Sequence, residues 1–207
     1  RHKFSFGGNG SIGIGIPGQI RQDGSIGHCP NTPVLKKFNV IAALKRDFGV
    51  PVLAENDANV AALAEYRYGA GQGLHRMVYV TVSTGIGGGI IENGRILSGC
   101  FHTAGELGHI VLQLDGERCG CGRRGCFEAY GRGPALEKRL QLRLSKKRLG
   151  SDEKKLLLPA GGQARLWTNQ HLGTALAQGN PVALAELDQH ARYLGEGLGS
   201  IANILDP

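Results

Sequence analysis

Short apolar runs and helical spacings alternate at the start of the chain. Residues 11–16 read Ser-Ile-Gly-Ile-Gly-Ile, an alternation typical of a strand, and Pro17-Gly18 ends it. Residues 34–48 carry apolar side chains at helical spacing, and Gly49 stands where a helix C-cap is expected. Residues 50–54 form a short apolar run, which favours a buried parallel strand. The order strand, helix, strand predicts a crossover unit of an α/β domain.

The middle of the chain begins with a helical pattern and continues with strands. Residues 58–68 are Ala-rich and favour a helix. Residues 77–83 are rich in β-branched side chains and predict a strand, which the Gly-rich string at residues 84–89 follows. Asn93-Gly94 is a strong signal for a tight turn. The pattern therefore predicts a strand, a glycine-rich turn, a second strand, a hairpin turn and a third strand.

From Pro134 onwards the spacing of apolar residues is mainly helical. Leu136, Leu140 and Leu144 recur every four residues and predict one buried helix face. Residues 182–205 predict one or two further helices. Three glycines in this last segment are expected to allow close helix packing: Gly195, Gly197 and Gly199.

Composition places the chain among ordinary globular proteins. It has 207 residues, of which 41% are apolar and 20% are charged. No apolar stretch reaches the roughly 18 residues of a membrane span, and no signal peptide is visible, so we expect a cytoplasmic protein without a membrane partner. The net charge is +7, and residues 132–155 hold nine basic and three acidic residues. Because no aromatic residues are interleaved, we interpret this stretch as a solvated helix face and do not expect nucleic-acid binding.

The cysteines indicate a metal site. Five cysteines are an odd number, and three of them lie within eight residues, which argues against a disulfide framework. Three thiolates and one imidazole complete a closed tetrahedral zinc site, whose role is structural because no coordination position stays open. The thiolates are those of Cys119, Cys121 and Cys126, and the alternative is three unrelated reduced cysteines.

The histidine of this site is not fixed by spacing alone, because three histidines lie near the cysteines in sequence: His75, His102 and His109. Cys29 and Cys100 have no such company, and we expect both to be small buried residues.

Two further strings have residue types suited to acid–base and phosphate chemistry. Asp57 follows a predicted buried strand, where its carboxylate could accept a proton, or where it could simply cap the next helix. Thr84 and Gly85 lie in the glycine-rich string, whose N–H groups could hold phosphate oxygens or could form a plain hairpin turn. Glu106 and Glu128 flank the cysteine loop, either as ligands for paired hydroxyl groups or as surface acids.

Four strings together resemble the ROK family of sugar kinases and repressors. They are the Gly-Ile-Pro-Gly of residues 15–18, the Glu-Asn-Asp-Ala-Asn of residues 55–59, residues 83–89, and residues 104–109 joined to the cysteine loop that ends at Glu128. The resemblance covers nearly the whole chain. It implies an α/β, actin-like (ribonuclease H-like) sugar kinase fold of two domains, in incomplete form. Residues 1–54 would be the remainder of a small N-terminal domain, and residues 55–207 a large C-terminal domain with the zinc loop.

The resemblance also implies an activity, which is ATP-dependent phosphorylation of a hexose, glucose first, with Mg²⁺ accompanying ATP. Asp57 would be the general base. The other implied roles are sugar contacts for Asn56, Glu106, His109 and Glu128, phosphate contacts for Thr84 and Gly85, and structural Zn²⁺ ligation for His109, Cys119, Cys121 and Cys126.

Two departures from the family pattern predict a fragment that lacks both ends. No Asp-x-Gly-Gly-Thr phosphate loop is present, and the chain stops at Leu205-Asp206-Pro207, where the family continues into a strand and a Gly-Gly nucleotide loop. The activity of the piece on its own is therefore in question. The family resemblance also predicts a homo-oligomer for the full-length protein.

Three alternatives stay open at this point. Residues 109–158 resemble N-acetylmannosamine kinases, including the Glu-Ala-Tyr after the cysteine loop. The family also contains sugar-responsive repressors with an N-terminal helix-turn-helix, although repressors commonly lose the Asn-Asp pair or the Thr-Gly-x-Gly turn that are intact here. The third alternative is a zinc-stapled binding module without catalysis.

Overall fold

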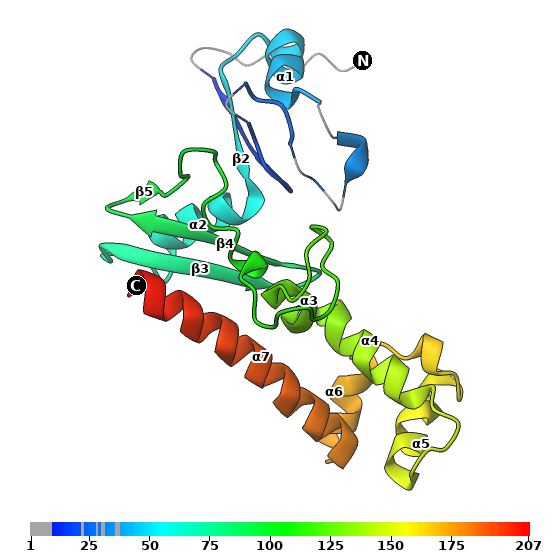
Figure 1. The fold of residues 1–207 in the computed structure, drawn as a ribbon. Helices are drawn as coiled ribbons and strands as arrows, with labels where there is room; N and C mark the ends of the chain where they lie inside the picture. The colour runs from blue at the N-terminus through cyan, green and yellow to red at the C-terminus, as the bar shows by residue number, and fades with distance from the viewer. Residues whose placement is uncertain (1–9, 22, 28, 30–31, 36–37) are drawn as a thin grey trace. The chain divides into compact units, whose positions relative to one another are not determined.

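The computed structural model describes the chain except residues 1–9, 22, 28, 30–31 and 36–37 (Figure 1). The chain forms two compact units: the first contains residues 1–81 and 87–106 with Pro207, and the second contains residues 82–86 and 107–206. Residues 55–81 therefore share a unit with residues 1–54. The assignment of residues 1–54 to a small domain and of 55–207 to a large one stays a prediction about the whole protein.

The first unit opens with the predicted crossover. Strand β1 (Ile12–Ile16) leads through α1 (Val40–Phe48) to β2 (Val52–Asn56), and the two strands pair in parallel. In this register Ile16 lies opposite Asn56, so both strands end at the same edge. Helix α2 (Asp57–Tyr68) follows directly and contacts both strands. The sheet edge that carries Asn56 is thus built by pairing in β1 and β2.

The helix predicted from residue 34 begins later than expected. Residues Pro33–Leu35 form a separate 3-10 turn, η1, and α1 starts at Val40. The start is fixed by Asn39, whose side chain accepts a hydrogen bond from the Ala42 N–H at 2.8 Å. The predicted end is confirmed, because Gly49 has a left-handed φ of 69° and its N–H donates to the Lys45 carbonyl.

A second sheet in the order β3-β4-β5 follows, made of β3 (Arg76–Val82), β4 (Ile86–Glu92) and β5 (Arg95–Ile96). The predicted Asn93-Gly94 turn joins β4 to β5, with φ of 49° and 79° at the two residues. The glycine-rich turn is shorter than predicted, since Gly87, Gly88 and Gly89 lie within β4. A Cβ on Gly89 would lie 2.6 Å from the Cβ of Ala62, so this glycine lets α2 lie close against the strand.

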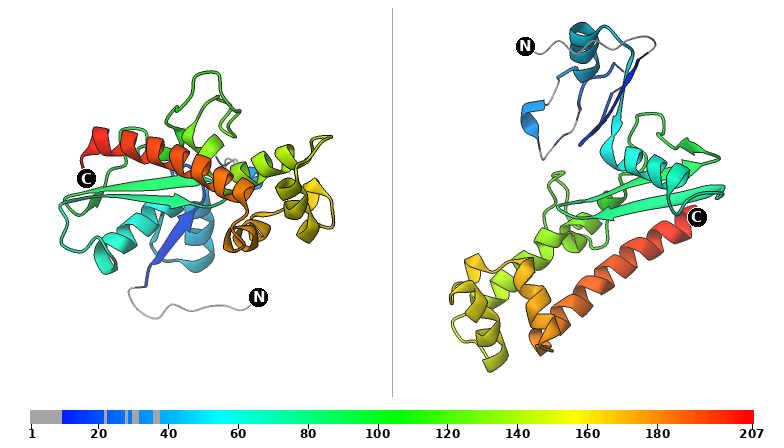
Figure 2. Two further views of the ribbon diagram at one scale, coloured as in Figure 1. Left: turned by 90° about the horizontal axis from the view of Figure 1, so that it is seen from below. Right: turned by 180° about the vertical axis from the view of Figure 1, so that it is seen from behind.

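The second unit is mainly helical. Its elements are η2 (Leu107–His109), α3 (Phe127–Gly131), α4 (Gly133–Leu144), α5 (Ser151–Leu157), η3 (Leu158–Ala160), η4 (Ala164–Leu166), α6 (Asn169–Ala177) and α7 (Pro181–Leu205). Segment 182–205 is one continuous helix (Figure 2). The predicted stripe of Leu136, Leu140 and Leu144 is buried and packs with Trp167, which is fully buried, in one core cluster.

Only one of the three glycines of α7 is used for close packing among the described residues. A Cβ on Gly197 would lie within 2.6 Å of the ring of Phe127, whereas one on Gly195 or Gly199 would meet nothing within 4 Å. Phe127 has 0% exposure, so its ring has little freedom to move aside. The expectation of close packing is therefore confirmed for Gly197 and wrong for the other two.

The two isolated cysteines differ in environment. Cys29 is buried as expected, with its Sγ 2.9 Å from the Pro17 carbonyl oxygen. Cys100 is exposed, contrary to expectation, because it lies in the turn that follows β5 rather than in a packed element. Among the helices of the described residues, none has the length and apolar character that a membrane span requires.

The packing at Gly197 generates a prediction about stability. Alanine is favoured over glycine in a helix by about 1 kcal/mol, whereas overpacking a core contact costs about 1–3 kcal/mol. Gly197→Ala should therefore lower the free energy of unfolding, and Gly199→Ala should leave it unchanged or raise it. Urea denaturation of both variants measures the difference. An equal effect of the two substitutions would contradict the contact with Phe127.

A second prediction concerns His190 of α7, which is 8% exposed and lies with its Nδ1 3.2 Å from Arg139 Nη2. Burial, and then the charge of Arg139, lower the pKa of His190 below 6.5, although the Tyr130 carbonyl opposes this. The other charged or titratable groups here are Glu186, which pairs with Arg139 at 3.6 Å, and Tyr193, whose ring lies under the Arg139 guanidinium.

Because the folded pKa is lowered, the unfolded chain binds this proton more readily than the native protein. The stabilising contribution of His190 is complete above pH 6.5, the usual pKa, and is lost as the pH falls from that value through the lower folded pKa. We expect the melting temperature to fall less between pH 7.5 and pH 5.5 in His190→Gln than in the wild type. Parallel pH profiles of the two proteins would show that another group is responsible.

Candidate active site and metal centre

The side chain of Asn56 ties together the end of β2, the start of α2 and the turn after β1. Its Oδ1 accepts hydrogen bonds from the Ala58 N–H at 2.9 Å and from the Asn59 N–H at 3.2 Å. Its Nδ2 donates to the Gly18 carbonyl at 3.2 Å. Asn56 is therefore the N-cap of α2, which corrects the alternative that Asp57 is the cap.

Asp57 is the first residue of α2 and its side chain is exposed. Its Oδ1 accepts one hydrogen bond, from the Ala58 N–H at 2.9 Å. The second carboxylate oxygen takes no part in this bond to the helix start. A carboxylate in the first turn of a helix is favoured by the positive end of the helix dipole. An exposed carboxylate at this place is one that could accept a proton from a bound hydroxyl.

Two neighbours of this pair were not assigned a role from the sequence. Glu55 Oε1 accepts hydrogen bonds from the Asn56 N–H at 2.8 Å and from Asn59 Nδ2 at 3.0 Å. Asn59 is 7% exposed, and its Oδ1 is buried without a hydrogen-bond partner among the described residues. Glu55 and Asn59 both belong to the family string at residues 55–59, but only the structure shows that they form hydrogen bonds with Asn56 and with each other. Glu106, which ends the segment 87–106 of the first unit, is exposed.

Residues 83–85 form the turn between β3 and β4, and we treat them together with Ile86, the first residue of β4, as the turn at residues 83–86, which lies in the second unit. The Ser83 N–H donates to the Gly85 carbonyl at 2.9 Å, which closes the turn. The Ser83 carbonyl accepts a bond from the Gly133 N–H at 3.0 Å, and the Ile86 N–H donates to Glu128 Oε2 at 3.0 Å. Thr84 at the tip is exposed. The turn is thus held at both ends by the junction of α3 and α4.

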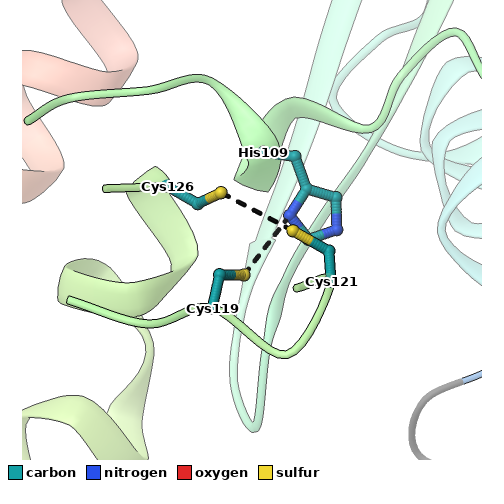
Figure 3. Close-up of side chains that lie close together, drawn as sticks. All are labelled: His109, Cys119, Cys121 and Cys126. Atoms are coloured by element: carbon teal, nitrogen blue, oxygen red, sulfur yellow. Dashed lines mark hydrogen bonds between the residues drawn. The ribbon is translucent and has the colours of Figure 1, made fainter. Parts of the chain in front are cut away.

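The four residues predicted to bind metal meet in one cluster (Figure 3). One ligand atom of each of His109, Cys119, Cys121 and Cys126 lies within 4.8 Å of the other three. Cys119 Sγ is 3.6 Å from His109 Nδ1, and Cys121 Sγ is 3.7 Å from Cys126 Sγ. Four ligands at the Zn–S distance of about 2.3 Å lie about 3.8 Å apart at the corners of a tetrahedron, so the donor set and its spacing fit Zn²⁺.

The geometry also selects one histidine of the three considered. The imidazole in the cluster is that of His109, at the end of η2, rather than that of His75 or His102. Arg123 Nη2 donates to the His109 carbonyl at 2.7 Å and so ties η2 to the cysteine loop. Within the loop, the Cys119 N–H donates to the Arg123 carbonyl at 2.9 Å. Hydrogen bonds of the protein itself therefore fold the loop back on itself and tie it to η2.

Electrostatics explains why this cluster suits a cation. Burial, the largest cause, raises the pKa of Cys119 to about 12 and also raises that of Cys126. Burial acts in the same direction on Cys121, but the Arg123 N–H and the two neighbouring thiols lower its pKa overall. The charged form is therefore favoured more at Cys121 than at Cys119 or Cys126. Three thiolates can coexist at this spacing only when a divalent cation neutralises them.

Glu128 lies between the metal cluster and the turn, and it is half-buried rather than a surface acid. Its Oε1 is 3.7 Å from Cys119 Sγ, while its Oε2 accepts the hydrogen bond from the Ile86 N–H. A Cβ on Gly85 would lie 2.6 Å from Oε2, so a larger residue at this position would have to displace the carboxylate. The second unit thus holds His109, Glu128, Thr84 and Gly85, and the first holds Asn56, Asp57 and Glu106.

A family model of known proteins matches nearly the whole chain. The model of the ROK family covers residues 2–207. The chain belongs to the ROK family. The ROK chain is 36% identical over 201 residues to the glucokinase of Streptomyces coelicolor, which covers 95% of this chain and 62% of the relative.

Other ROK relatives carry different names. The xylose repressor of Bacillus subtilis is 35% identical over 201 residues, covering 96% of this chain and 47% of the repressor. The N-acetylmannosamine kinase of Citrobacter koseri is 41% identical over 126 residues, which are 60% of this chain and 43% of that kinase. Sequence similarity therefore establishes the family, whose similar members include sugar kinases and a repressor.

A solved ROK structure shows the fold. The crystal structure of a ROK family glucokinase from Streptomyces griseus in complex with glucose and AMPPNP matches with a TM-score of 0.82 and 36% identity, covering 95% of this chain and 62% of that one. The actin-like α/β fold of ROK sugar kinases, predicted from the motifs, is thereby confirmed. The chain spans less than two thirds of the length of these glucokinases.

Proposed function

We propose that the protein containing this chain is a hexokinase-type phosphotransferase that moves a phosphoryl group from ATP to a hexose, with glucose as the first candidate. The observation that carries the proposal is the likeness, over 95% of the chain, to a glucokinase solved with glucose and AMPPNP. The intact Asn56-Asp57 pair at the end of β2 supports it, because open α/β sheets bind ligands at the carboxyl ends of their strands.

In this proposal Asp57 accepts the proton of the attacking sugar hydroxyl. The exposed carboxylate has one oxygen outside the helix cap, which is the requirement for a general base. Contacts with the other sugar hydroxyls are proposed for Asn56, Glu106, His109 and Glu128. Thr84 and Gly85 would lie beside the transferring phosphate, with Mg²⁺ accompanying ATP.

The cluster of three thiols and one imidazole is proposed as a structural Zn²⁺ site formed by His109, Cys119, Cys121 and Cys126. All four coordination positions would be filled by protein, so the ion has no position open for a reacting group. Its contribution would be to hold the cysteine loop, which has few apolar side chains of its own, against η2 and α3. We also propose that the whole protein is a homo-oligomer.

The phosphotransferase is tested by ADP release from the complete protein with ATP, Mg²⁺ and a panel of sugars. We expect turnover on glucose, and we expect Asp57→Asn to lower kcat by at least about a hundredfold, the usual size of a general-base contribution. Asp47→Asn makes the same charge change at the exposed end of α1 and should retain kcat. Full turnover by Asp57→Asn, after matching melting temperatures show it is folded, would refute the assignment of the base.

The sugar panel also decides between related functions. Turnover only on N-acetylmannosamine would support the second candidate, which the 41% identity to an N-acetylmannosamine kinase favours. Sugar binding without turnover on any sugar would contradict the kinase and favour a repressor.

The zinc site is tested by metal analysis of the purified protein. We expect one zinc per chain, with X-ray absorption showing three sulfur ligands and one nitrogen. Cys121→Ser should reduce the zinc content well below one and lower the melting temperature, because a loop held by an ion loses that stabilisation without it. Cys100→Ser changes an exposed cysteine outside the cluster and should keep the zinc. Full zinc in Cys121→Ser would refute the ligand set.

A further inference from the structure

The carboxylate of Glu128 touches two features that are distant in sequence. Its Oε2 accepts the hydrogen bond of the Ile86 N–H at 3.0 Å, across 42 residues, and its Oε1 lies 3.7 Å from Cys119 Sγ. One oxygen therefore faces the turn at residues 83–86, and the other faces the cysteine cluster. All of these residues belong to the second unit.

The position of Glu128 depends on the cluster through the backbone as well. Cys126 is the N-cap of α3, and Glu128 lies in the first turn of that five-residue helix. So short a helix has little stability of its own and depends on what holds its ends. A cation that fixes Cys126 therefore also fixes the start of α3, and with it the direction of the Glu128 side chain.

The other end of the turn is held without help from the cluster. The Ser83 carbonyl accepts the Gly133 N–H, and the Gly133 carbonyl accepts a bond from Asn169 Nδ2 at 2.9 Å. This second tie runs to α4 and α6, away from the cysteine loop. Among the hydrogen bonds that join the turn to helices in the described residues, the Ile86–Glu128 bond is the one that leads toward Cys119.

We propose that Glu128 is a positioning residue that couples metal occupancy of the His109–Cys cluster to the order of the turn at residues 83–86. An occupied cluster holds α3 and keeps the Ile86 N–H bonded. Loss of the ion loosens the start of α3 and releases that end of the turn. The inference rests on the proposed metal site and not on the proposed phosphotransferase activity, so it extends the role of Glu128 beyond a sugar contact.

Amide hydrogen exchange of peptides that span residues 83–86 tests the coupling directly in the complete protein. In the wild type, removal of zinc by dialysis against a chelator should speed exchange at the turn at least about tenfold, the size expected for loss of a backbone hydrogen bond to a charged group. Glu128→Ala should exchange fast with zinc still bound. Glu128→Gln keeps an oxygen acceptor and should restore slow exchange in the zinc-bound protein.

Two further variants make the test specific. Glu153 also accepts a backbone N–H bond, from Gly150 at 2.8 Å, but it lies on α5 and pairs with Arg143, so Glu153→Ala should leave exchange at the turn as in the wild type. Gly85→Ala places a Cβ 2.6 Å from Glu128 Oε2 and should break the same bond from the other side, which gives a second reading if Glu128→Ala does not fold.

Either of two results would overturn the proposal. The first is slow exchange at the turn in zinc-bound Glu128→Ala. The second is an equal acceleration on zinc removal in the wild type and in Glu128→Ala, which would show that coupling bypasses the carboxylate. Because exchange does not require turnover, the test gives its answer even if the protein phosphorylates no sugar.

Discussion

The ring of Phe127 fills the contact between α3 and α7, and the chemistry of the second unit is arranged around it. The ring is fully buried and packs against α7 where Gly197 has no side chain. Side chains one residue apart on a helix point about 100° apart, so a ring that faces α7 turns its sequence neighbours elsewhere. The carboxylate of Glu128 follows the ring on the helix, whereas Cys126 precedes it as the N-cap. Packing of the ring therefore anchors α3 against α7, and the cysteine cluster lies at the start of that helix.

Local pattern was sufficient for the frame of the fold. The crossover of β1, α1 and β2 was predictable because buried parallel strands leave short apolar runs and a C-cap glycine marks the helix end. The start of α1 was not, because residues 34–38 continue the apolar spacing while the actual cap, Asn39, depends on its contact with Ala42. Gly87–Gly89 were misplaced for a related reason: glycine is typical of turns and of close backbone approach, and only the position of α2 decides between them.

The candidate site divides in the same way. The three cysteines of the cluster could be grouped from sequence because they are close in sequence and therefore close in space. Of three nearby histidines, only His109 enters the cluster, a choice that needed the family motif or the structure. The two contacts of Glu128 could not be predicted, since Ile86 and Cys119 become neighbours only after α3 has packed. The detailed contacts of a site thus depend on residues that are distant in sequence, and a local sequence pattern does not show which of them will meet.

The side chain of Asn56 has a mechanical consequence. Three backbone segments end on it: Gly18 after β1, its own strand β2, and the first amides of α2. Sliding of these segments past one another would break the bonds of this amide, so its hydrogen bonds oppose that motion. Asp57, the first residue of α2, is held next to the strand ends by the same side chain.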